Sequence, residues 1–96
     1  MAQVDIVLPF RDAERTLDEA IRSIVRQTFS EWQLLLINNS STDGSSLMAL
    51  RWATRDPRIV VVHEPKVGVA HALNTGVGHG AAPYIARMDA DDIAHP

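Results

Sequence analysis

Three aspartates stand within four residues near the end of the sequence, at Asp89, Asp91 and Asp92. Carboxylates this close repel one another by about 1 kcal/mol per pair in water at ~4 Å, and a cation relieves that repulsion. Asp89 and Asp91 can face one divalent ion, Mg²⁺ or Mn²⁺, while substrate phosphates complete its coordination. Alternatively, acidic residues before Ile93 would stabilise the N-terminus of a helix. The aspartates alone leave both interpretations open.

The segments before the aspartates alternate between strand and helix patterns. Residues 84–88 predict a buried strand that runs directly into the acidic cluster, and residues 4–8, 33–37 and 59–63 predict three earlier strands. Apolar residues recur with helical spacing between them, around residues 13–25, 47–52 and 69–77. Asp12 is the predicted N-cap of the first helix. This order indicates right-handed crossovers, and therefore an α/β fold with a three-layer, Rossmann-like parallel sheet (β-α-β-α-β-α-β).

The polar-rich loops all follow predicted strands. They occupy residues 10–12, 38–43, 64–66 and 89–92. Because ligands of parallel sheets bind beyond the carboxyl ends of the strands, four such loops predict one shared site. This position favours the metal interpretation of the aspartates.

Composition narrows the possible partners. The 96 residues carry nine basic and twelve acidic side chains, interspersed, for a net charge of −3. No basic stripe suits a nucleic-acid backbone, so we expect no nucleic-acid partner. No apolar run approaches the ~20 residues of a membrane span, and a cytoplasmic location is the expectation. Without cysteine, metal ligands must be oxygen or imidazole, but the four histidines match no compact ligand motif; they are His63, His71, His79 and His95.

Five short motifs occur in a fixed order along almost the whole chain. They lie at residues 6–14 (IVLPFRDAE), 23–29 (SIVRQTF), 36–44 (LINNSSTDG), 68–76 (GVAHALNTG) and 84–92 (YIARMDADD), with Pro96 after the last. Together they resemble the inverting family 2 glycosyltransferases, which have the GT-A fold, and the aspartates resemble that family's Asp-x-Asp motif.

The resemblance implies a role for each matching residue. Residues 9–12 (Pro9, Phe10, Arg11 and Asp12) would form the floor of a nucleotide site, and Asp91 would be the direct ligand of Mn²⁺ or Mg²⁺. Asp89 would contact the ribose or the metal's water shell, and Asp92 would be more peripheral. Lys66 could reach a phosphate, although a lone loop lysine is commonly only solvated. Arg87 is expected to pair with a neighbouring carboxylate.

Position 39 departs from the family pattern. The family usually has aspartate followed by glycine there, with the aspartate facing the base, whereas this chain has Asn39 and Ser40. Asparagine keeps a carbonyl acceptor and gains a donor. A UDP-sugar is therefore the favoured donor, while a different base, or a purely turn-shaping role for Asn39, stays open. We expect Ser41 and Asp43 to be helix caps.

The resemblance also implies that the 96 residues are the N-terminal, donor-binding part of a truncated GT-A domain. The general base of an inverting transferase would lie beyond Pro96, so we assign no catalytic residue and expect the transferase to be the parent protein. We expect the 96 residues alone to be inactive and to self-associate through uncovered sheet surface. Contact of the parent with a membrane stays open.

Four other functions compete with this interpretation. A sugar-phosphate nucleotidyltransferase needs a glycine-rich loop after the first strand, but residues 9–13 contain no glycine. A phosphoacceptor receiver needs an acidic pair after its first strand and a phosphorylatable aspartate after its third, whereas here the acidic cluster follows the fourth predicted strand. Residues 76–81 fit the loose dinucleotide pattern G-x-G-x-x-A, but they end a helix instead of following a strand. A non-catalytic binding or assembly module stays open because of Asn39.

Overall fold

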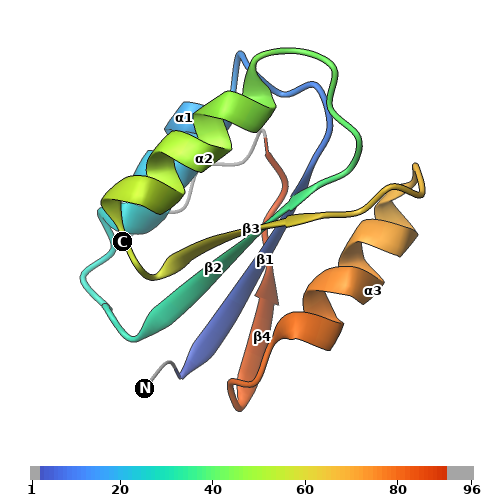
Figure 1. Cartoon of the computed structure of the whole chain (residues 1–96). Coiled ribbons are helices and arrows are strands. Elements are labelled where there is room, and N and C mark those ends of the chain that lie inside the picture. Colours follow the sequence, from blue (N-terminus) through green and yellow to red (C-terminus); the bar gives the residue numbers. More distant parts are fainter. Residues whose placement is uncertain (1–2, 91–96) are drawn as a thin grey trace.

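The computed structural model describes residues 3–90, which form a parallel four-stranded sheet between two helical layers (Figure 1). Helices α1 and α2 cover one face, and α3 covers the other. The elements in chain order are β1 (Val4–Phe10), α1 (Leu17–Val25), β2 (Trp32–Asn38), α2 (Ser45–Arg55), β3 (Ile59–His63), α3 (Val69–His79) and β4 (Tyr84–Arg87). The predicted three-layer α/β architecture is confirmed.

The strand order β3-β2-β1-β4 reverses direction at β1. The chain steps outward from β1 to β3, and α3 then returns it to the other side of β1. Phe10 pairs with Asn38, and Asn38 pairs with His63, so the first three strands end level with one another. Because Arg87 pairs with Val7, β4 ends three residues below the level of Phe10, and the chain that follows it continues up to the rim, where Asp89 lies beside Pro9 and Phe10. The register therefore brings the four polar loops to one rim, next to the reversal where such sheets bind ligands.

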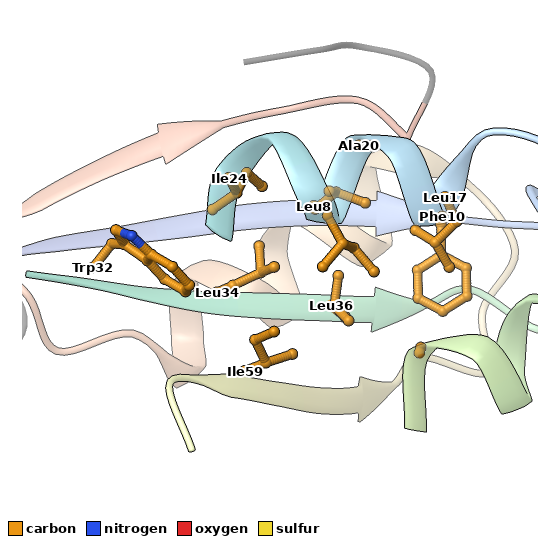
Figure 2. Close-up of a cluster of buried hydrophobic side chains, with 11 residues drawn as sticks. Leu8, Phe10, Leu17, Ala20, Ile24, Trp32, Leu34, Leu36 and Ile59 are labelled. Atoms are coloured by element: carbon orange, nitrogen blue, oxygen red, sulfur yellow. The ribbon is translucent and has the colours of Figure 1, made fainter. Parts of the chain in front are cut away.

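The face under α1 and α2 holds most of the core. Leu8, Leu34 and Leu36 point from the sheet toward Ala20 and Ile24 of α1 (Figure 2). Eleven of the described residues form this cluster, and all of them are at most 3% exposed. Alternate residues of β1 and β2 supply it because side chains of a strand point to opposite faces in turn.

The face under α3 is more lightly packed. Its buried cluster consists of Val7, Leu35, Ile37 and Ala72 among the described residues. Gly76 allows α3 to approach the sheet, because a Cβ at that position would collide with the side chain of Val7 and crowd Ile37.

Two local predictions are wrong. The first helix begins at Leu17 with Thr16 as its N-cap, because residues 13–16 form a turn in which Leu17 donates to the carbonyl of Ala13 at 2.9 Å. Asp12 therefore does not cap α1. The last strand ends at Arg87, and all four of its residues are exposed because β4 forms an edge of the described sheet.

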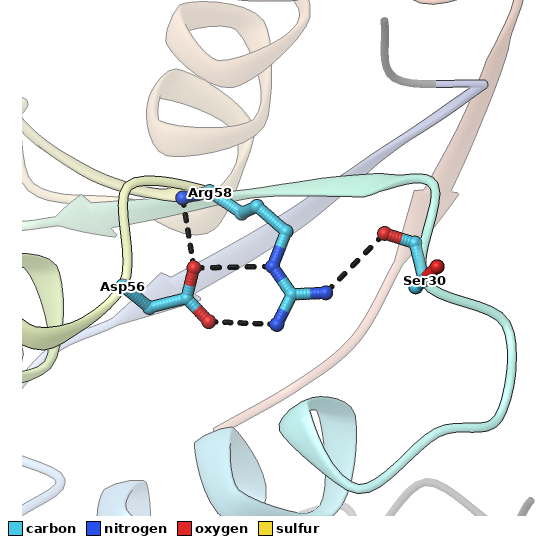
Figure 3. A network of polar contacts seen from close by, with 3 residues as sticks. All are labelled: Ser30, Asp56 and Arg58. Carbon is cyan, nitrogen blue, oxygen red and sulfur yellow. Dashed lines mark hydrogen bonds and ion pairs between the residues drawn. The ribbon is translucent and has the colours of Figure 1, made fainter.

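The amino ends of the strands carry a separate polar cluster. Arg58 makes two hydrogen bonds through its guanidinium to Asp56 and a third, at 3.2 Å, to the carbonyl of Ser30 (Figure 3). The same guanidinium stacks 3.8 Å from the centre of the Trp32 ring. A groove of about 460 Å³ opens here, and it contains none of the predicted site residues. The polar groups of this groove join the loop before β2, at Ser30, to the turn before β3, at Arg58.

Candidate functional site

A smaller cleft opens at the rim where β1 and β4 end. Its volume is about 250 Å³, and it is lined by Pro9, Phe10, Arg11, Asn39, Val67, Gly68, Val69 and Asp89. Five of these residues, Pro9, Phe10, Arg11, Asn39 and Asp89, belong to the seven for which the sequence predicted nucleotide contact. The other two, Asp12 and Lys66, lie outside the lining.

The first loop forms one wall of the cleft. Phe10 is 3% exposed and packs its ring into the α1/α2 core, so it presents mainly backbone at the rim. Its carbonyl accepts a hydrogen bond from the backbone N–H of Asn39 at 2.9 Å, which joins the first loop to the second. Arg11 is exposed, and its guanidinium makes no hydrogen bond to any described residue. Arg11 is thus a cation beside the cleft that has no partner within residues 3–90.

Asp12 ties the first rim loop to the second. Its carboxylate accepts from the backbone N–H of Thr42 at 2.6 Å and of Asp43 at 3.2 Å, while its own N–H donates to Ser41. The bond from the Thr42 backbone is the main reason that the pKa of Asp12 lies below the ordinary value. Its backbone is left-handed, with φ of 50°, a conformation that aspartate tolerates better than most residues. Asp12 therefore holds the first two rim loops together and does not itself line the cleft.

Asp43 lies one residue before the N-cap of α2, which is Gly44 and has no side-chain capping bond, so the expectation that Asp43 caps this helix is wrong. Its carboxylate accepts from the hydroxyl of Ser45 and, at 2.9 Å, from the backbone N–H of Ser45, the first residue of α2. The Ser45 hydroxyl bond is the leading cause of a lowered pKa for Asp43. The same expectation for Ser41 is wrong, because its hydroxyl accepts the N–H of Asp12 instead.

Asn39 is buried at the centre of the rim, with 4% of its surface exposed. Its amide nitrogen donates to the carbonyls of Lys66 at 2.8 Å and Glu64 at 3.2 Å. Its amide oxygen accepts the backbone N–H of Gly68 at 2.9 Å. Asn39 thus lines the cleft and at the same time holds the loop that follows β3.

The loop after β3 supplies a wall that the sequence reasoning missed, formed by Val67, Gly68 and Val69. Gly68 has φ of 135°, a backbone conformation that favours glycine. Gly68, a glycine immediately before a helical pattern, could have indicated this wall from the sequence. Val67 and Val69 are apolar and could not, because such side chains do not by themselves indicate a binding site. Lys66 is exposed, and its ammonium group has no hydrogen-bond partner among the described residues.

Glu64 braces this loop against α3. Its carboxylate accepts from the Thr75 hydroxyl and, at 2.8 Å, from the backbone N–H of Lys66. The Thr75 hydroxyl is the first cause of the lowered pKa of Glu64. The brace fixes the strand end that leads into the Val67–Val69 wall.

Asp89 brings the acidic motif to the cleft. Arg87 donates to its carboxylate through two guanidinium nitrogens, at 3.0 and 3.2 Å, as the sequence led us to expect for Arg87. Both side chains are 51% exposed, so the ion pair contributes little stability. Asp91 and Asp92 lie outside the described residues. Within residues 3–90, no three histidine or acidic side chains gather in a way that could hold a metal ion.

The described histidines form no such group either, and His95 is outside the described range. None of the helices described is long and apolar enough to cross a membrane.

Comparison with known proteins places this chain and its fold in a family. The model described as "Glycosyl transferase family 2" matches residues 5–96. The chain is 37% identical over 89 residues to the uncharacterized glycosyltransferase EpsJ of Bacillus subtilis, covering 93% of this chain and 26% of that protein. It is 34% identical over 91 residues to WfgD of Escherichia coli, a UDP-Glc:alpha-D-GlcNAc-diphosphoundecaprenol beta-1,3-glucosyltransferase, covering 94% of this chain and 35% of that protein.

Solved structures agree with the fold. The mannosyltransferase PcManGT of Pyrobaculum calidifontis, in complex with GDP-Man and Mn²⁺, superposes with a TM-score of 0.87 at 27% identity, covering 95% of this chain and 28% of that one. S. aureus TarS in complex with UDP also gives a TM-score of 0.87, at 18% identity, with 97% and 28% of the two chains covered. The chain thus spans about a quarter to a third of these proteins. Its sequence motifs, sheet topology and family match agree, and the chain belongs to glycosyl transferase family 2.

Proposed function

We propose that the rim cleft binds the nucleoside diphosphate part of a nucleotide-sugar donor, as the donor-binding part of a glycosyltransferase. One observation carries this proposal. A cleft lined by Pro9, Arg11, Asn39 and Asp89 opens where the strand order reverses, in a chain of this family. The PcManGT and TarS structures, which contain GDP-Man and UDP respectively, support a nucleotide as the ligand.

The charges around the cleft suit a diphosphate. Arg11 offers a guanidinium at the lining that no described residue binds, and Lys66 offers an ammonium group on the adjacent loop. Guanidinium groups bind phosphate oxygens with paired hydrogen bonds, whereas ammonium groups act as point charges. In this proposal Arg11 contacts the diphosphate directly, and Lys66 reaches it from the rim.

The acidic motif would hold a divalent cation. Asp89 places a carboxylate at the cleft, and oxygen donors of this kind suit Mn²⁺ or Mg²⁺. We assign Asp91 as the direct ligand and Asp89 to the ribose or the metal's water shell, as in the family pattern. When bound, the cation neutralises the diphosphate as it leaves the sugar. Arg87 keeps the Asp89 carboxylate oriented through its two hydrogen bonds.

The proposed reaction of the whole protein is transfer of the sugar to an acceptor hydroxyl. The hydroxyl oxygen attacks the anomeric carbon, the bond from that carbon to the diphosphate breaks, and the hydroxyl proton passes to a general base. We assign that base to no residue of this chain. The donor site and the acceptor-side chemistry thus belong to different parts of the proposed enzyme.

Calorimetric titration tests the donor site. We expect UDP, GDP or TDP to bind more tightly with Mn²⁺ than without it, with UDP favoured. Asp91→Ala and Asp89→Ala should each weaken the Mn²⁺-dependent binding by about tenfold or more, since a charged ligand contact is lost. Glu19→Ala, which removes an exposed carboxylate of α1, is the matched control and should bind as the unmodified chain does.

Binding that is indifferent to Mn²⁺, or to Asp91→Ala in a chain whose circular dichroism is unchanged, would contradict the donor-site proposal. The non-catalytic alternative makes a different prediction. Metal-dependent nucleotide binding without glycosyl transfer by the whole protein would favour a binding or assembly module.

We also propose that two copies of this chain associate through β4. The four residues of this edge strand are exposed, and Tyr84 and Ile85 are 68% and 51% exposed. A free edge presents unpaired backbone N–H and C=O groups that a second strand can bind. Sedimentation should show a dimer that Ile85→Lys dissociates, and a monomer at high concentration would refute the pairing.

A further inference from the structure

The two departures from the family pattern contact the same loop. Asn39 donates both amide hydrogens to the carbonyls of Glu64 and Lys66, at 3.2 and 2.8 Å. Ser40 donates its hydroxyl toward the carbonyls of Glu64 and Pro65, at 3.3 and 3.2 Å. Three consecutive carbonyls of the loop after β3 are therefore held by two consecutive side chains of the loop after β2.

The usual aspartate and glycine of the family could not make these bonds. An ionised carboxylate has no hydrogen to donate, and at Asn39 it would place negative charge against the carbonyls of Glu64 and Lys66. Glycine has no side chain at all. Ser40 has φ of 64°, in the left-handed region where glycine is favoured, so this chain keeps the hydroxyl where the backbone alone would prefer glycine.

The loop of residues 64–66, which Asn39 and Ser40 bind, leads directly into the cleft wall. The amide oxygen of Asn39 accepts the N–H of Gly68, and Gly68 lines the cleft between Val67 and Val69. On the other side of the loop, Glu64 accepts from Thr75 of α3 and from the backbone of Lys66. Asn39 is 4% exposed, so water competes little for its amide.

We propose that Asn39 and Ser40 are positioning residues that fix residues 64–68 as a preformed wall of the nucleotide cleft. The amide of Asn39 acts through the loop, and its value to the site lies in the two hydrogens that aspartate lacks. Only the identity of the cleft's occupant rests on the proposed function; the clamp on the loop does not.

The variant Asn39→Asp separates this role from direct reading of the base. If the side chain at position 39 served mainly to accept a hydrogen bond from the base, a carboxylate would strengthen UDP binding, because charge-assisted hydrogen bonds are stronger. If it positions the loop, the same variant loses two donors and loosens the wall. The two roles predict opposite changes in the affinity for UDP.

The experiment combines hydrogen exchange of the free chain with titration by UDP in the presence of Mn²⁺. For Asn39→Asp we expect the Lys66 amide to exchange about tenfold faster and UDP to bind about fivefold or more weakly, from the loss of hydrogen bonds of ordinary strength. Ser40→Gly should accelerate exchange in the same loop. Asn74→Asp, which adds the same charge at an exposed position of α3, is the matched control for both readouts.

Tighter UDP binding by Asn39→Asp, or exchange in residues 64–68 equal to that of the unmodified chain, would overturn the proposal. If the unmodified chain bound no nucleotide, the proposed function would fail, yet the exchange measurement would still decide whether Asn39 and Ser40 hold the loop.

Discussion

The two faces of the sheet differ in how much they bury. Among the described residues, eleven form the cluster under α1 and α2, whereas four form the cluster under α3. The cleft wall at Val67, Gly68 and Val69 leads into α3, on the lightly packed side. Buried apolar area is the main source of folding free energy, so the first face supplies most of the stability. The second face relies more on polar contacts, such as those of Asn39 and Glu64.

Two adjacent residues of β2 test this difference directly. Leu36 points to the α1/α2 face and Ile37 to the α3 face, and both are fully buried. We expect Leu36→Ala to cost about 3–5 kcal/mol of unfolding free energy and Ile37→Ala about 2–3 kcal/mol, because a lightly covered cavity collapses more easily. Urea unfolding monitored by circular dichroism measures both. Equal costs would show that the two faces contribute alike.

A substitution at Gly76, where α3 lies close to the sheet, should have the next largest effect on stability. Gly76→Ala should cost about 1–3 kcal/mol, because the new methyl group would collide with Val7. Gly78→Ala is the matched control in the same helix, since its Cβ would meet nothing within 4 Å. Its higher helix propensity should stabilise the chain by about 0.5–1 kcal/mol. Thermal melts that shift in the same direction for both variants would refute close packing at Gly76.

Low pH should destabilise the rim loops, with a smaller effect on stability than the substitutions at Leu36, Ile37 and Gly76. Hydrogen bonds lower the pKa of Asp12, chiefly from the Thr42 backbone, and of Asp43, chiefly from the Ser45 hydroxyl. A carboxyl whose folded pKa lies below its unfolded value of about 4 contributes stability above that value and loses it as the pH falls through the folded pKa. These two groups should therefore leave the melting temperature constant from pH 7 to 5 and lower it below about pH 4.

The variant Asp12→Asn should flatten this acid-induced fall, because one of the titrating groups is gone. Glu19→Gln on α1 is the comparison, since Glu19 makes no hydrogen bond to a described residue. A melting temperature that falls equally steeply in Asp12→Asn and in the unmodified chain would exclude the Asp12 contacts as the cause.

The fold followed from the sequence because strand and helix periods alternate clearly, and the polar loops marked the carboxyl ends of the strands. Exposure of β4 was not predictable, since whether a strand lies at an edge depends on which strands pair with it. Asp12 was misassigned because an acidic residue before a helical pattern can cap the helix or bond another loop, and only the tertiary arrangement decides.

The candidate site was predictable only in part. Pro9, Arg11 and Asp89 reached the cleft because strand register fixes their height on the rim. The commitment of Asn39 to the carbonyls of Glu64 and Lys66 depends on a loop 25 residues away in the chain, and no local pattern encodes it. The family pattern therefore predicted where Asn39 lies, but it did not predict which groups Asn39 hydrogen-bonds.

Mapping the ligand site by nuclear magnetic resonance tests the central claim most directly. We predict that UDP with Mg²⁺ shifts the backbone signals of residues 10–11, 39 and 67–69, and that replacing Mg²⁺ with Mn²⁺ broadens the signals around Asp89. The signals of Trp32 and Arg58, in the groove at the opposite end of the sheet, should stay unchanged. Shifts and broadening confined to that groove, with the rim unaffected, would contradict the assignment of the rim cleft as the donor site.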